Sequence, residues 1–309
     1  MDAKQQILAM LKAADDVVSG ETLSAALGVS RVSVWKHIKS LTLAGIPIQA
    51  SSKGYRLVRD LDSLWPWEFD ARQDRIHYFR ETPSTMDEAT ALARKGCPEF
   101  TVVVAQRQTR GRGRLQRTWL SGDGGLYFTV VLRPEIPLMQ AGLVNLAAAI
   151  DMAGVLRSQH RVDARLKWPN DILVGQGKIC GVLSQMEVEG DLLRYLTIGL
   201  GLNVNNGPEG EMAAAVSIRG LLGQQVPRRP ILTAFLDRFE RRMAVFDADA
   251  VIDQWRSNAV TIGRRVRVVT IKAQVEGLAV DVDSYGGLIV QLTDGSRQTV
   301  RVGDCFHRE

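Results

Sequence analysis

The residues best suited to chemistry are arginines gathered in one short stretch. Positions 107 to 117 hold five arginines, two glycines and no acidic residue. Glycine lets the backbone bend where other residues resist, and the planar guanidinium group suits the oxygens of phosphates and carboxylates. The stretch therefore predicts a mobile lid that binds an anion. A solvated basic loop is the alternative that composition leaves open, because most charge runs are simply solvated.

The residues after this stretch argue against a dinucleotide-binding loop. Such a loop needs a strand before it and a helix after it, whereas residues 124–132 are rich in β-formers. The rest of the chain shows no protein nucleophile: the four histidines are scattered, and neither a G-x-S-x-G elbow nor a pair of carboxylates stands out. The chain therefore fits a kind of chemistry that relies on positioning and on cations placed where negative charge develops.

Further motifs follow the arginines in a fixed order. K-W-P-N-D occupies 167–171, Lys178 is followed by Gly181, and G-L-G-L-N occupies 199–203. Together with G-R-G-R at 111–114 and Trp119 behind it, this order resembles the biotin protein ligases. The likeness covers nearly the whole chain, because the N-terminus also resembles the DNA-binding module of the bifunctional ligases that repress biotin operons.

The resemblance implies an activity and partners. Members of this family join biotin and ATP into biotinyl-5'-AMP with Mg²⁺, and pass the biotinyl group to a lysine of the biotin carboxyl carrier protein of acetyl-CoA carboxylase. An ordered lid would protect the mixed anhydride from water. The resemblance also implies operator DNA as a partner and a homodimer that forms when the adenylate is bound.

The resemblance also implies roles for individual residues. Lys167 would contact the biotin carboxylate and the bridging oxygen of the adenylate, Trp119 would stack on adenine, and Asn203 would bond the base edge. Asn170 and Asp171 would place Mg²⁺ or the incoming lysine. The implied biotin-binding residues are Ser84, Thr85, Gln108, Arg112, Arg114 and Lys167. The implied ATP-binding and adenylate-binding residues are Arg117, Trp119, Asn170, Lys178 and Asn203, and the implied catalytic residues are Arg112, Arg114, Arg117, Lys167 and Asp171.

The chain departs from the family pattern at two places. Met86 stands where relatives usually have asparagine, and Leu115-Gln116 stands where many have Arg-Gly. The first departure puts any role of that amide in doubt, and the second removes one cation and one flexible residue from the lid. Ser84 and Thr85 also have a simpler interpretation, because hydroxyls at a helix start are often caps.

The N-terminal residues predict a winged helix-turn-helix domain. Residues 4–19 and 21–27 have helical spacing, Ser30 is a good N-cap, and a third helix follows it. Residues 46–49 and 55–58 flank a hairpin with a basic tip, and residues 22–59 hold six Lys or Arg and no acid. The side chains expected to meet a major groove or its backbone are Arg31, Ser33, Lys36, His37 and Lys53. A small helical interaction domain with a solvated basic face is the alternative.

The remaining chain predicts an α+β fold. Residues 143–156 predict a buried helix, Trp168 is expected in a core, and successive strands up to 202 predict an antiparallel or mixed sheet backed by helices. Short alternating strands from 261 predict a β-barrel similar to the SH3-like domain of these ligases. The expected domains are a winged helix-turn-helix at 1–60, a linker at 61–75, a class II synthetase-like catalytic domain at 76–260 and the SH3-like domain at 261–309.

Composition sets the cellular context. With 309 residues and 45% hydrophobic content, the chain can bury the cores of two or three domains, and its net charge of +5 suits a polyanionic partner. The longest apolar stretch, 141–156, is interrupted by Asn145 and Asp151, and no signal-peptide pattern precedes it. We therefore expect a cytoplasmic protein without a membrane partner. The spacing of Cys97, Cys180 and Cys305 fits neither a disulfide framework nor a zinc site, and no other metal site stands out.

The leading hypothesis is an ATP-dependent biotin protein ligase that also represses transcription. Two alternatives stay open. A lipoate or octanoate transferase shares the catalytic fold, although the paired G-R-G-R and K-W-P-N-D blocks favour biotin. A ligand-sensing DNA-binding regulator with weak or no ligase activity is the second; the intact lysine and arginines argue against it, while the departures at 86 and 115–116 support it.

Overall fold

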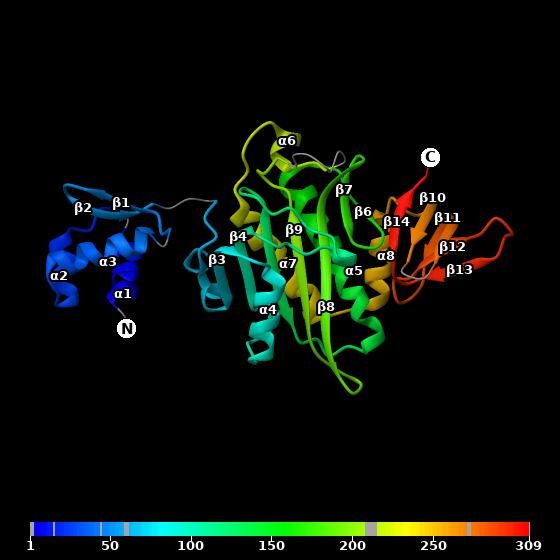
Figure 1. The fold of residues 1–309 in the computed structure, drawn as a ribbon, viewed down its shortest axis with the longest axis horizontal. Coiled ribbons are helices and arrows are strands. Elements are labelled where there is room, and N and C mark those ends of the chain that lie inside the picture. The colour runs from blue at the N-terminus through cyan, green and yellow to red at the C-terminus, as the bar shows by residue number, and fades with distance from the viewer. Residues whose placement is uncertain are drawn as a thin grey trace. The chain divides into compact units, whose positions relative to one another are not determined.

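A computed structural model describes residues 3–14, 16–43, 45–58, 62–207, 215–270 and 273–308. The chain divides into two compact units, Met1–Ser63 and Leu64–Glu309. Figure 1 shows the helices and strands of both units.

The first unit is a helix-turn-helix followed by a two-stranded wing, which confirms that prediction. Ser19 Oγ accepts a hydrogen bond from the amide of Thr22 at the start of the second helix, and Gly28 ends that helix in a left-handed conformation. Ser30 caps the third helix by accepting from the amide of Ser33 at 3.2 Å. The elements are α1 (Ala3–Ala13), α2 (Gly20–Leu27), α3 (Arg31–Leu43), β1 (Ile48–Ser51) and β2 (Gly54–Leu57). Their shared core holds Ile7, Leu11, Leu23, Val34, Ile38 and Leu41.

The first helix is shorter than its apolar spacing predicts. It ends at Ala13, and Val18 instead forms an antiparallel bridge with Tyr55 of the wing. Pairing with the wing satisfies backbone groups that the helix would otherwise bond.

The second unit is built on a mixed sheet of seven strands in the order β3-β4-β5-β9-β8-β7-β6. The β3 and β4 strands are parallel, and the other neighbouring pairs are antiparallel. The strands are β3 (Ile76–Thr82), β4 (Val102–Gln108), β5 (Leu126–Leu132), β6 (Ala164–Lys167), β7 (Asp171–Val174), β8 (Gly177–Glu189) and β9 (Leu192–Leu202). The predicted mixed sheet backed by helices is confirmed.

Alternate residues of these strands face different helices, as the two-residue period of a strand requires. Val103 packs with Ala89 and Ala93 of α4 (Thr85–Arg94). Val102 and Val104 point into the main core, which is shared with α5 (Ala141–His160) and α7 (Arg228–Ala244). The sheet therefore lies between α4 and the other two helices, and the start of α4 meets one end of the strands (Figure 1).

The α5 helix is buried on nearly all sides between Leu143 and Leu156, and the predicted buried helix is confirmed. Residues 138–160 are long and apolar enough to cross a membrane by length and composition, but 78% of the apolar window is buried inside the protein. Asp151 within it is paired with Arg242 of α7 at 2.7 Å. The helix also packs against α8 (Ala248–Asn258), which the apolar pattern did not predict. The short α6 (Ile218–Leu222) follows the sheet.

The chain ends in a five-stranded antiparallel sheet ordered β13-β12-β11-β10-β14, and the predicted SH3-like domain is confirmed. Its strands are β10 (Arg265–Val269), β11 (Gln274–Val282), β12 (Leu288–Gln291), β13 (Arg297–Val300) and β14 (Asp304–His307). The sequence did not predict β14, because a strand as short as D-C-F-H carries little alternation. Trp168 is 2% exposed and donates its indole N–H to the carbonyl of Gly286 at 2.9 Å, which confirms its packing role.

Most of the segment predicted as a linker is folded onto the second unit. Residues 59–61 lie outside the described residues. Leu64 and Phe69 are buried in the main core, and short 3-10 helices occupy Pro66–Glu68 and Asp70–Arg75. Arg72 also pairs with Glu240 of α7 at 2.7 Å. Composition alone predicts a linker here, because acidic residues separate the apolar residues that pack into the core.

Candidate active site

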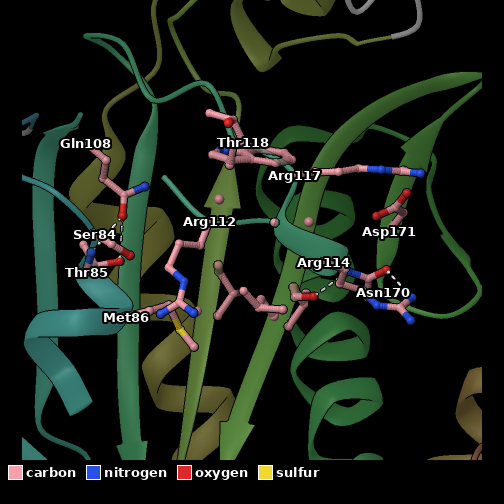
Figure 2. A pocket seen from close by; sticks show the side chains of 18 of the residues that line it. Ser84, Thr85, Met86, Gln108, Arg112, Arg114, Arg117, Thr118, Asn170 and Asp171 are labelled. Atoms are coloured by element: carbon pink, nitrogen blue, oxygen red, sulfur yellow. Dashed lines mark hydrogen bonds between the residues drawn. The ribbon is translucent and has the colours of Figure 1, made fainter. Parts of the chain in front are cut away.

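One cavity of the second unit gathers most of the residues predicted to bind biotin or ATP. It lies where the first turn of α4, the lid and strands β7, β8 and β9 meet. Figure 2 shows Ser84, Thr85 and Gln108 at one end, and Asn170 and Asp171 at the other. The predicted residues that line it are Ser84, Thr85, Gln108, Arg112, Arg114, Arg117, Trp119, Asn170, Asp171 and Lys178.

The end formed by α4 and β4 is an uncharged hydrogen-bond network. Gln108 Oε1 accepts from the backbone amide of Thr85 at 2.8 Å and from its hydroxyl at 3.1 Å. Gln108 Nε2 donates to Ser121 Oγ at 2.8 Å, and Thr129 donates to the Thr85 hydroxyl at 2.9 Å. The polar groups of Gln108 and Thr85 are therefore held in place by the fold itself.

Ser84 occupies the N-cap position of α4, but its side chain makes no capping hydrogen bond. The side chain is fully buried, and its hydroxyl has no hydrogen-bond partner among the described residues. Buried hydroxyls are nearly always paired, since an unpaired one costs free energy. The cap interpretation therefore does not account for Ser84, whereas a ligand group in the cavity would satisfy its hydroxyl.

The lid forms a short 3-10 turn at Arg114–Gln116. Leu115 has a φ of 50°, a left-handed conformation that glycine adopts far more readily. Arg114 reaches past this turn and donates to the carbonyl of Gly303 at 3.0 Å, in the C-terminal domain. Burial lowers the pKa of the Arg114 guanidinium below its ordinary value. The lid is thus fastened to the last domain of the chain.

Two other lid arginines face carboxylates of the protein. Arg112 Nη1 lies 2.6 Å from Asp87 of α4, and Arg117 pairs with Asp304 of β14. Both arginine side chains are partly exposed, at 43% and 62%. The Arg112–Asp87 pair is exposed on both sides and contributes only about 0–1 kcal/mol, whereas the Asp304 side chain is only 14% exposed. A ligand phosphate or carboxylate could therefore replace Asp87 at little cost.

Lys178 supplies the ammonium group inside the cavity. Its Nζ lies 2.6 Å from Asp171 Oδ1 and 5.1 Å from the centre of the Trp119 ring. The Trp119 indole packs on the backbone of Gly181 and Gly201, where any side chain would collide with it. Its indole N–H is buried without a partner in the part of the chain that the structure describes. The two glycines thus set the position of an aromatic ring that faces the cavity.

Two predicted residues lie elsewhere. Lys167 does not line the cavity in the described structure; it is half-buried in the edge strand β6. Burial, with the nearby charge of Lys167, lowers the pKa of His307 in the C-terminal domain to about 4. Asn203 is also absent from the described lining; its side-chain oxygen accepts from Asn206 at 2.9 Å. The contacts predicted for Lys167 and Asn203 stay predictions.

The cavity also includes residues that the sequence did not assign to a ligand. Gly199 and Gly201 line it. Their G-x-G alternation could have predicted this, because two glycines two residues apart leave one face of a strand without side chains and make room for a ligand. Asp304 lines it too, from a domain whose pattern suggested only structure. Met86, noted earlier as a departure, faces the same space.

A magnesium ion would find only a sparse set of protein ligands here. Within the described ranges, no cluster of three or more His, Cys, Asp or Glu side chains could hold a metal. The cavity contains the carboxylates of Asp171 and Asp304. Mg²⁺ commonly binds through one or two carboxylates plus the phosphates of its substrate. The residues present therefore fit a nucleotide-borne Mg²⁺ and not a protein cage.

The first unit places its predicted DNA-binding residues on the solvent side of α3 and on the wing. Arg31 is exposed at the start of α3, Lys36 is exposed on the side opposite the buried Val34 and Ile38, and Lys53 is exposed at the wing tip. Ser33 and His37 are half-buried beside them. Trp35 is 50% exposed, with Lys39 Nζ 5.1 Å from its ring centre. The face is basic and free of acids.

Comparisons with known proteins match three parts of the chain. Residues 78–203 match the Biotin/lipoate A/B protein ligase family, residues 3–56 an HTH domain, and residues 261–308 the Biotin protein ligase C terminal domain. The chain is 33% identical to the Bifunctional ligase/repressor BirA of Bacillus subtilis, over 93% of each chain. It is 30% identical to the Biotin--[acetyl-CoA-carboxylase] ligase of Paracoccus denitrificans, over 73% of this chain and 97% of the relative.

A solved structure agrees with these matches. The biotin protein ligase from Aquifex aeolicus in complex with biotin and ATP superposes with a TM-score of 0.63 and 28% identity, over 75% of this chain and 98% of the other. The likeness to the Bacillus subtilis protein extends through all three matched regions. The chain therefore belongs to the family of bifunctional biotin protein ligases and repressors.

Proposed function

We propose that this protein condenses biotin with ATP to biotinyl-5'-AMP and transfers the biotinyl group to a lysine of the biotin carboxyl carrier protein of acetyl-CoA carboxylase. The carrying observation is a single cavity with an uncharged hydrogen-bonding end and a cationic end. Biotin has the matching polarity, with a neutral ureido group at one end and a carboxylate at the other. The name of the Paracoccus denitrificans relative includes acetyl-CoA carboxylase, the enzyme to which this carrier protein belongs.

In the first step, a carboxylate oxygen of biotin attacks the α-phosphorus of ATP, and pyrophosphate leaves. Ser84, Thr85 and Gln108 bind the ureido group. The Ser84 hydroxyl has no partner in the described part of the chain, and it lies at the same end of the cavity as the fixed Gln108 amide (Figure 2). Arg112 and Lys178 exchange their carboxylate partners for the substrate oxygens and stabilise the charge that develops on phosphorus.

The remaining cavity residues hold the nucleotide. Arg114 and Arg117 bind phosphate oxygens, and Trp119 stacks on adenine from its fixed place over β8 and β9. Asn170 and Asp171 orient the nucleotide phosphates and the incoming amine. Asp171 would hold a Mg²⁺ ion carried by ATP, and that ion would supply positive charge against the repulsion between the phosphates and the biotin carboxylate.

In the second step, the neutral amine of the carrier lysine attacks the acyl carbon of the adenylate. The amide bond forms, AMP leaves, and the amine loses its proton to solvent or to Asp171. The closed lid excludes water before this attack, so hydrolysis does not compete. In this mechanism Lys178 performs the task that the sequence assigned to Lys167, because Lys178 is the ammonium within the cavity.

The first unit represses transcription by binding operator DNA in the cytoplasm. Arg31, Lys36 and Lys53 contact phosphates or base edges, with Ser33 and His37 beside them. The adenylate-bound protein forms a homodimer, and two helix-turn-helix units then match a palindromic operator.

The ligase test incubates the full chain with biotin, ATP, Mg²⁺ and a biotin carboxyl carrier domain. Labelled carrier is the expected product, and its absence contradicts ligase activity. Competition with lipoate and octanoate distinguishes a transferase for those acids. DNA binding without turnover would instead support a ligand-sensing regulator.

The repressor test measures retardation of biotin-operon DNA with and without biotin plus ATP. We expect binding that requires both ligands and weakens as salt rises, since phosphate contacts release counterions. Lys36→Ala should weaken binding to operator and unrelated DNA, while carrier labelling stays unchanged. Binding that ignores ligand and salt would contradict the repressor mechanism.

A further inference from the structure

The proposed reaction leaves the cavity residue Met86 without a role. Met86 lies in the first turn of α4, is 3% exposed and lines the cavity. Its thioether lies against Gly199: a Cβ added to Gly199 would lie 2.5 Å from Met86 Sδ and 3.1 Å from Met86 Cγ. Met86 and the backbone of Gly199 therefore form one packed surface.

This surface belongs to an apolar wall. Val182, Leu183 and Leu200 line the same cavity, and Met86 directly follows the uncharged hydrogen-bonding end in sequence. The neighbouring hydroxyl of Thr129 already donates to Thr85. A polar side chain buried at this position would need a new partner, whereas methionine needs none and its flexible thioether adapts to the shape of a ligand.

Biotin presents a matching sequence of groups. Between its ureido ring and its carboxylate chain lies a fused five-membered ring that contains a thioether. If the ureido group is bound at Ser84 and the carboxylate at the cations, this apolar ring has to lie along the wall between them. We propose that Met86 packs against the sulfur-containing ring and makes the site favour biotin over analogues that lack this ring. The inference rests on the proposed ligase function.

The test compares biotin with desthiobiotin, which keeps the ureido ring and the carboxylate chain but lacks the sulfur ring. Adenylation is measured as the exchange of label between pyrophosphate and ATP that requires biotin or desthiobiotin, in the full-length protein. Met86→Ala should raise the KM for biotin about tenfold, as expected for losing one apolar side-chain contact, and change that for desthiobiotin by less than about twofold. Met86→Leu, which keeps the volume, should retain most of the preference, and the KM for ATP should not move.

Gly199→Ala provides an independent check, because its methyl group pushes the thioether aside without changing Met86 itself. Gly199→Ala should also weaken the binding of biotin more than that of desthiobiotin. Its effect should be smaller in a protein that already carries Met86→Ala, since the two residues are in contact. Calorimetric binding of biotin in the absence of ATP should follow the same order.

Each other result overturns the inference. An equal loss with both acids would mean that Met86 contacts a group they share, and a parallel loss for ATP would mean that the whole cavity is damaged. Unchanged biotin affinity in Met86→Ala would mean that the ring lies elsewhere. A wild-type protein that does not adenylate biotin would overturn the proposed function itself, which is a separate result.

Discussion

The two ends of the cavity are built in different ways. At the uncharged end, Thr85 and Gln108 belong to a helix and a strand, and hydrogen bonds of 2.8 and 3.1 Å join them. The cations instead come from the lid: Arg117 pairs with Asp304 of β14, and Arg112 pairs with Asp87 of α4, the helix that also carries Thr85. One end is fixed by the sheet, and the other is held by contacts that a ligand can exchange.

This difference shows which contacts contribute to the stability of the folded protein and which a ligand can replace. A buried network loses stability when one member is removed, because its partners stay desolvated and unpaired. An exposed ion pair contributes little, so replacing its carboxylate by a ligand oxygen changes little. We therefore expect the uncharged end to govern which acid binds, and the charged end to govern the chemical step and lid closure.

The largest expected effect is at the cavity ammonium. Lys178→Met should lower kcat/KM for adenylation by about 10³-fold, the size of effect seen when one group that stabilises transition-state charge is removed. Lys167→Met is the matched control, since this lysine lies outside the cavity lining. Its effect should be less than about tenfold. Pyrophosphate exchange measures both. A larger loss at Lys167 would restore the role that the sequence first suggested for it.

The next effect concerns the uncharged end and has opposite signs for stability and binding. Ser84→Ala removes a buried hydroxyl that has no partner among the residues the structure describes, so the ligand-free protein should become more stable by about 1 kcal/mol. The same change should weaken biotin binding about tenfold, because the bond to the ureido group is lost. Denaturant unfolding and calorimetry measure the two quantities.

Thr85→Val is the comparison for Ser84→Ala. It breaks bonds to Gln108 and Thr129, and should lower stability by about 1–3 kcal/mol as well as weaken binding. A loss of stability in Ser84→Ala would show that its hydroxyl is satisfied in the ligand-free protein.

The sequence predicted the fold well wherever the pattern was local. The wing, the buried α5 and most strands follow from alternation and caps that neighbouring residues carry. The predicted linker failed because Leu64 and Phe69 find their partners far along the chain. Likewise, β14 is defined by its pairing with β10 and not by its own composition.

The site was predictable in composition but not in geometry. The motifs indicated that arginines, a lysine and hydroxyls would meet, and most of them do. They gave Lys167 and Lys178 separate roles but did not show which lysine lines the cavity, because that depends on the pairing of β6, β7 and β8. Nor did they indicate Asp304, since its part in the cavity arises from the contact of the lid with another domain.

The smallest effect tests whether the lid cations are held provisionally. Asp87→Asn removes the charged partner of Arg112. Because residue 87 does not line the cavity, the substitution acts on the ligand only through Arg112. Because the pair is exposed, the guanidinium should then be available to substrate, and the affinity for biotinyl-5'-AMP should rise by about two- to fivefold. The gain should shrink at high salt, which screens the original pair.

Asp163→Asn is the matched control: it breaks a similarly exposed pair with Arg165 at 2.7 Å, far from the lid in sequence, and should leave the affinity for biotinyl-5'-AMP unchanged. Weaker binding in Asp87→Asn would mean that Asp87 aims Arg112 at the ligand, and the charged end would then be as fixed as the uncharged one.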